Sequence, residues 1–185
     1  MDSFLFAGGL SIPAVVQAGL AAYFTELTPK KFDMTDVENL KLLALGSIRL
    51  YPPVIGVPYI DTTTGQRHVP LPGYAGLDQS VYGLDANEFR IRGDLQYYHS
   101  RSLNWADSAL PVDGKAHTNH ICPGRSMSFN MIVAFWEALD AIMWCVDPST
   151  EIKKENGPTC WSSFTLTKKV GDKKEKMKCR EQEDK

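Results

Sequence analysis

The sequence predicts an α+β protein in which helices dominate and small sheets are added. Apolar residues recur at helical spacing in two stretches, and two short extended runs flank a polar turn. No internal repeat is present. The 185 residues are 43% hydrophobic and 23% charged, which is the composition of a globular protein with a single core.

An apolar helix is predicted over residues 1–27. No charged residue occurs from Ser3 to Thr25, so three interpretations are open: a buried helix, a membrane span or anchor, and a signal peptide. Glycines and a proline weaken the span, and the absence of a basic start weakens the signal peptide. We therefore favour a buried helix and leave membrane contact open.

Two further helices are predicted. The first starts at Thr35, where Thr35 and Glu38 fit a capping box, and stops at Tyr51-Pro52-Pro53 because proline lacks the amide hydrogen. The second follows Cys122-Pro123-Gly124 and ends at Asp147-Pro148. Its predicted apolar stripe consists of Met127, Met131, Phe135, Ala138, Leu139, Ile142 and Met143.

Strands and loops account for the rest of the chain. Val54 to Ile60 and Arg67 to Val69 flank the turn 61–65, which indicates a hairpin. The stretch from Leu71 to His120 is rich in Gly, Pro, Asp and Ser, and so long a loop is expected to wrap a ligand. Trp161 to Val170 is predicted to be a final strand pair or an extended tail.

Charge and cysteine content exclude some classes of protein. The formal net charge of −2 gives no reason to expect a nucleic-acid partner. The basic cluster Lys168 to Lys178 contains acidic residues, and we interpret residues 171–185 as a disordered charged tail. Four cysteines without a CxxC pair indicate free thiols and hence an intracellular protein.

The segment 119–125 is the candidate site for chemistry. Cys122 stands at the start of a helix, where the positive end of the helix dipole favours the thiolate that an iron porphyrin needs as axial ligand. Gly124 would let the backbone approach a flat macrocycle. Two alternatives stay open: a buried structural cysteine, and a zinc site with His117, His120 and Cys122 that lacks a fourth ligand.

Four segments, in chain order, resemble the C-terminal half of the cytochrome P-450 fold. They are residues 6–11, 49–54, 87–92 and 122–124, which are similar to the distal I-helix, the K-helix end, the meander and the ligand loop before the L-helix. Small β-sheets lie between them in that fold. The resemblance covers residues 1–170 and implies a partial heme-thiolate domain with heme (iron protoporphyrin IX) as its cofactor.

The resemblance also implies roles for individual residues. Cys122 is the metal ligand, and the other cofactor-binding residues are Arg49, His120 toward a propionate, and Gly124. Gly8, Gly9 and Ser11 line the distal face as catalytic residues. The chain begins at the distal helix, so we expect a truncated or degenerate member of the superfamily.

Within the superfamily the sequence is most similar to allene oxide synthases and hydroperoxide lyases. Asn119 stands three residues before the cysteine, the loop before Cys122 is long, and residues 161–165 resemble the substrate-contacting turn of that branch. Members that activate dioxygen carry an acid and a threonine where this chain has Leu10 and Ser11. The resemblance therefore implies a lipid hydroperoxide as substrate, since its O–O bond is already made.

The sequence also departs from the family pattern. Gly46 replaces the glutamate of the Glu-x-x-Arg motif, so the acidic partner of Arg49 is missing, a destabilising state for a buried arginine. Leu5 replaces the distal asparagine, Lys115 a phenylalanine of the ligand loop, and His120 an arginine.

Three functions follow as hypotheses. The first is a heme-thiolate lyase or isomerase of fatty acid hydroperoxides, and the second is a monooxygenase that uses dioxygen and a reductase. The third is an inactive heme-protein remnant. A reductase is expected as a partner only in the second case.

Overall fold

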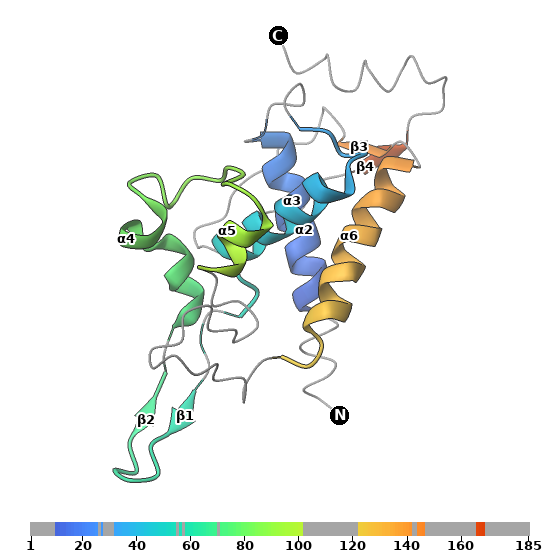
Figure 1. Cartoon of the computed structure of the whole chain (residues 1–185). Coiled ribbons are helices and arrows are strands. Elements are labelled where there is room, and N and C mark those ends of the chain that lie inside the picture. The colour runs from blue at the N-terminus through green and yellow to red at the C-terminus, as the bar shows by residue number, and fades with distance from the viewer. Residues whose placement is uncertain are drawn as a thin grey trace.

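The computed structural model describes residues 10–25, 27, 32–54, 56, 58–69, 71–101, 122–141, 144–146 and 166–168. In these segments the protein is mostly helical and contains little strand, as the sequence predicts (Figure 1). The longer elements are the helices α2 (Ser11–Thr25), α3 (Val37–Leu50) and α6 (Arg125–Ala141). The short helices are η2 (Pro72–Leu77), α4 (Gln79–Tyr82) and α5 (Leu95–His99).

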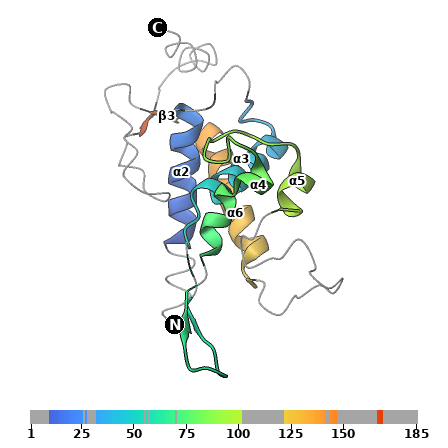
Figure 2. The same ribbon diagram turned by 90° about the vertical axis from the view of Figure 1, so that its left-hand side faces the viewer.

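The core lies where α2, α3 and α6 meet. Each of the three helices contacts the other two, and α2 and α6 begin at the same end of the molecule in both views (Figures 1 and 2). Trp136 of α6 is fully buried against α2. Gly19 of α2 makes this possible, because a Cβ there would collide with the Trp136 ring.

The apolar stretch near the N-terminus is a buried helix in its described part. Every residue of α2 from Ala18 to Tyr23 is buried, as are Val15 and Val16 before them. Among the described residues, no helix has the length and apolar character needed to cross a bilayer. Residues 1–9, which the prediction included in this helix, lie outside the described residues.

The predicted capping box of the second helix is wrong. The helix α3 starts at Val37, and its N-cap is Asp36, whose carboxylate accepts a hydrogen bond from the Glu38 amide at 2.9 Å. Thr35 instead donates its amide and its hydroxyl to Asp33. An aspartate and a threonine are both good caps, so the sequence alone could not choose between neighbours. The predicted end at Tyr51 is confirmed.

The third predicted helix is confirmed but shorter than expected. The helix α6 ends at Ala141, and Trp144–Val146 form the strand β3 before the predicted stop at Asp147. Of the predicted apolar stripe, Met127, Met131 and Phe135 are exposed, whereas Leu139 packs against the core. The face that packs into the core consists of Ile132, Val133 and Trp136, with Phe129 and Leu139 beside them.

Both small sheets are antiparallel pairs. The predicted hairpin is confirmed as β1 (Tyr59–Ile60) and β2 (Arg67–His68), with Tyr59 opposite His68. It extends away from the helices in both views (Figures 1 and 2). The strand β4 (Leu166–Lys168) lies within the predicted final extended segment, but its partner is β3, with Cys145 opposite Thr167. The predicted tail, residues 171–185, lies outside the described residues.

We predict opposite effects for alanine at two helical glycines. Gly19→Ala should destabilise the protein by about 1–3 kcal/mol, because the new methyl group overpacks the contact between α2 and Trp136. Gly46→Ala should stabilise it by about 0.5–1 kcal/mol, because alanine is the better helix former and its Cβ would lie 3.5 Å from the nearest atoms. Urea unfolding of the two variants measures both. Equal signs would contradict the packing described here.

Candidate functional site

The structure describes some of the predicted site residues and brings two of their segments to one end of the molecule. Ser11 is the first residue of α2, and Cys122 lies three residues before the first residue of α6. Because α2 and α6 start at the same end, both lie toward that end (Figures 1 and 2). Gly8, Gly9 and His120 lie outside the described residues.

Cys122 lies just before α6, and backbone hydrogen bonds connect its loop to the first turn of that helix. Its carbonyl accepts a hydrogen bond from the Arg125 amide at 3.1 Å, and the Gly124 carbonyl accepts one from the Ser128 amide at 2.8 Å. The Cys122 side chain is partly exposed. Within the described segments, a Cβ placed on Gly124 would meet the Cys122 sulfur at 3.8 Å and no other atom within 4 Å. Within the described segments, no side chain other than that of Cys122 therefore lies close to Gly124 on the side that faces the sulfur.

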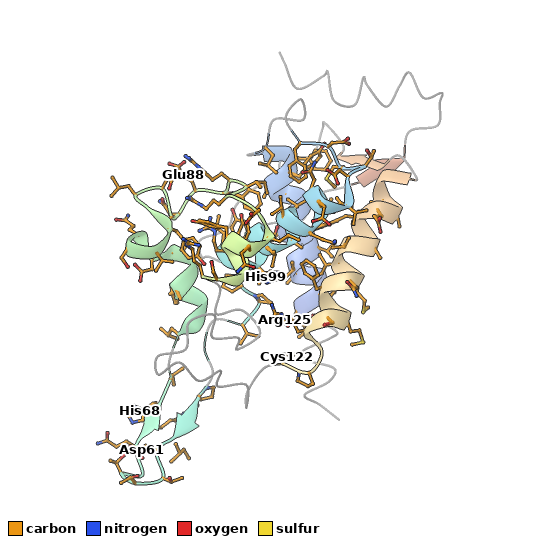
Figure 3. The ribbon with its side chains drawn as sticks, viewed as in Figure 1. Asp61, His68, Glu88, His99, Cys122 and Arg125 are labelled. Carbon is orange, nitrogen blue, oxygen red and sulfur yellow. The ribbon has the colours of Figure 1, made fainter. Side chains whose placement is uncertain are left out.

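A contact that the sequence did not predict joins α5 to this loop. Arg125 Nη2 lies 3.1 Å from His99 Nδ1, and the two side chains are neighbours near Cys122 (Figure 3). Because a guanidinium can only donate, Nδ1 must be the acceptor, and the ring hydrogen is then on Nε2. The two residues are 26 positions apart in the chain, so no local pattern could reveal the pair.

Arg49 is buried at the end of α3, with 2% of its surface exposed. Its Nη1 donates to the carbonyls of Gly76 at 2.7 Å and Ala86 at 2.5 Å, and its Nη2 donates to the carbonyl of Glu88 at 2.8 Å. The guanidinium also lies 5.1 Å from the centre of the Tyr82 ring. The partners of Arg49 are thus carbonyls and an aromatic ring in place of the carboxylate whose absence the sequence predicts.

The charge of Arg49 is stabilised by dipoles. Burial lowers the pKa of Arg49, and the nearby charge of Arg92 lowers it further. Three carbonyl dipoles and the aromatic face offset this cost, and an arginine keeps its proton in such a site. Burial also raises the pKa of Tyr82 and Tyr98, which keeps both phenols neutral beside it.

A second arginine orders the segment that supplies these carbonyls. Arg92 Nη1 donates to the Asp85 carboxylate at 2.9 Å and to the Tyr82 carbonyl at 2.8 Å, and its Nη2 donates to the Asp85 carbonyl. Arg90 also pairs with Asp85 at 2.7 Å, but at the surface. The segment of residues 82–92 is thus tied to itself by Arg92 and to α3 by Arg49.

The space beside Gly46 of α3 is filled by other side chains. A Cβ on Gly46 would lie 3.5 Å from the Phe89 ring and 3.5 Å from the Tyr98 hydroxyl. That hydroxyl accepts a hydrogen bond from the Arg92 amide at 3.0 Å. An aromatic ring and a neutral phenol therefore occupy the space next to α3 that a side chain at position 46 would enter.

The described residues contain no group of three or more His, Cys, Asp or Glu side chains that could hold a metal ion. His117 and His120 of the zinc hypothesis lie outside the described part of the chain, so that hypothesis stays a prediction. Comparison of the chain with family models, with curated proteins and with solved structures gives no match.

We predict that Arg49→Lys destabilises the protein by about 2–4 kcal/mol. A lysine has one ammonium group in place of a planar fork, so it cannot serve three carbonyls in different directions, and buried acceptors lose their donors. The matched control is Arg90→Lys, at a side chain that is 53% exposed, with an expected change within about 0.5 kcal/mol. Urea unfolding compares the two, and equal effects would contradict the cluster.

We predict that Asp85 makes folding sensitive to acid. The hydrogen bond from Arg92 lowers the pKa of Asp85 below its ordinary value. The stabilisation is therefore present above about pH 4 and is lost as the pH falls through the lowered folded value. Asp85→Asn should be less stable than the parent at neutral pH, and the difference should vanish once the pH is well below the folded value. Urea unfolding across this range measures it, and a pH-independent difference would refute the coupling.

Proposed function

We propose that this protein is a heme-thiolate protein in which Cys122 is the ligand of the heme iron. The observation that carries the proposal is the surroundings of the sulfur. Cys122 is a partly exposed thiol directly before a 17-residue helix, and among the described residues only the sulfur itself approaches the open side of Gly124. A flat macrocycle needs this kind of access to a thiolate ligand.

The residues that the chain offers fit such a group. Cys122 would supply the thiolate that donates electron density to the iron, and Gly124 would admit the plane of the macrocycle without a side chain in the way. His120, which lies outside the described residues, stays the predicted donor to a propionate. When bound, the heme would supply the redox-active iron.

Arg49 contributes to this proposal indirectly. Its Nη groups donate to the carbonyls of Gly76, Ala86 and Glu88, which leaves them no role toward a ligand. We therefore assign Arg49 to positioning: it fixes residues 76–88 against α3. The short helix α5 follows this segment, and His99 at its end contacts Arg125 beside the Cys122 loop.

For the reaction we propose the rearrangement or cleavage of a fatty acid hydroperoxide. Leu10 and Ser11, at the start of α2, stand where members that activate dioxygen carry an acid and a threonine. A carboxylate at position 10 would be the expected source of protons for the cleavage of dioxygen, and a hydroperoxide needs no such delivery. A dioxygen- and reductase-dependent monooxygenase and an inactive heme-protein remnant are the alternatives.

The decisive test of heme ligation is Cys122→Ser. The parent chain reconstituted with heme should give the ferrous carbonyl spectrum of thiolate-ligated heme, and the serine variant should lose it, because a hydroxyl is not a thiolate ligand. Cys145→Ser, in the strand β3, is the matched control and should keep the spectrum. Survival of the spectrum in the Cys122 variant, or its absence from the parent, would refute the proposal.

Turnover assays on the heme-loaded chain distinguish the three proposed functions. Consumption of a fatty acid hydroperoxide without NADPH, lost in Cys122→Ser, is the expected result for a lyase or isomerase. Dependence of turnover on a reductase and dioxygen would instead identify a monooxygenase. Heme ligation without either activity would identify the remnant.

A further inference from the structure

The helix α6 has two apolar faces, and the described elements cover one of them. Ile132, Val133 and Trp136 are buried against α2 and α3. On the other face Met127, Met131 and Phe135 are 52%, 50% and 46% exposed. Large apolar side chains gathered on one helix face in water indicate a contact with something else. Among the described elements, α6 lies at the edge of the helical core (Figure 1).

The exposed face follows a narrow line along the helix. Met127, Met131, Ala134 and Ala138 are separated by four, three and four residues and are all exposed. This spacing returns to the same side of an α-helix at each step, as in the seam of a helix pair. We call these four residues the α6 seam. Phe135 lies directly beside it.

The α6 seam is complementary to itself when two copies run in opposite directions. If the midpoint between Met131 and Ala134 is the centre of the pair, Met131 lies opposite Ala134 of the second copy. Met127 then lies opposite Ala138 of that copy. Every large side chain faces a small one, which is how packed helix faces interdigitate.

The parallel arrangement lacks this complementarity. It would set methionine against methionine at one end and alanine against alanine at the other, so the helices would splay apart. The helix dipoles also favour the antiparallel pair, because antiparallel helices place opposite dipole ends next to each other.

We propose that two copies of this chain associate through the α6 seam as an antiparallel, two-fold symmetric pair. A two-fold contact uses the same patch on both copies, and the seam meets that requirement. One helix face supplies less than the roughly 800 Å² per partner of a typical stable interface. The dimer is therefore weak, with a dissociation constant of about 1–100 µM. The pairing is independent of heme binding at Cys122.

Sedimentation velocity of the full chain at increasing concentration tests the association. The parent should pass from monomer to dimer within the micromolar range. Ala134→Glu places a charge in the seam and should weaken the dimer at least about tenfold. Because Ala134 is exposed, the monomer should keep its fold, and an unchanged circular dichroism spectrum checks this. Ser126→Glu adds the same charge to an exposed position of α6 outside the seam and should leave the dimer intact.

A mixing experiment tests the direction of the two helices. Met131→Lys and Ala134→Glu should each be monomeric alone, since each places one type of charge in an apolar contact. Mixed in equal amounts they should form a heterodimer, because the new ammonium group of one variant faces the new carboxylate of the other only in the antiparallel pair. A parent that stays monomeric at all concentrations would overturn the proposal. A dimer insensitive to Ala134→Glu would overturn it too, as would a mixture that fails to associate.

Discussion

The engagement of Arg49 by three main-chain carbonyls is the constraint on which the arrangement of the described loops depends. Gly76, Ala86 and Glu88 belong to a stretch that contains only short helices. A buried guanidinium that donates to all three ties this stretch to α3. A Cβ on Gly76 would collide with the Arg49 carbonyl, so the chain can approach the end of α3 this closely only with glycine there.

Arg49 is neutralised by carbonyls and has no carboxylate among the partners described. A carboxylate neutralises a guanidinium through its charge, whereas carbonyls do so through dipoles that must be aligned by the backbone. Alignment here depends on Arg92, which binds the carbonyls of Tyr82 and Asp85 and the carboxylate of Asp85. The two arginines therefore act together, although they repel each other. The stability of this region then rests on the path of the backbone more than on any one ion pair.

The sequence predicted the elements better than it predicted their contacts. Proline at position 52 ended α3, and the turn around Gly65 defined the hairpin, because both depend on local backbone geometry. The partners of Arg49 lie 27 to 39 residues away, beyond the reach of any local pattern. The ligand role proposed for Cys122 rests on a resemblance, while its position at the start of α6 follows from the sequence pattern.

The exposure of Met127, Met131 and Phe135 in the predicted apolar stripe of α6 has a physical cause. The helix carries apolar residues around most of its circumference, so its periodicity could not tell which face is buried. The bulk of Trp136 and the matching Gly19 of α2 decided the outcome, because a large ring needs a hole on the opposite helix. The same helix begins at the Cys122 loop, so one rigid element carries the candidate ligand at its start and an exposed apolar face along its length.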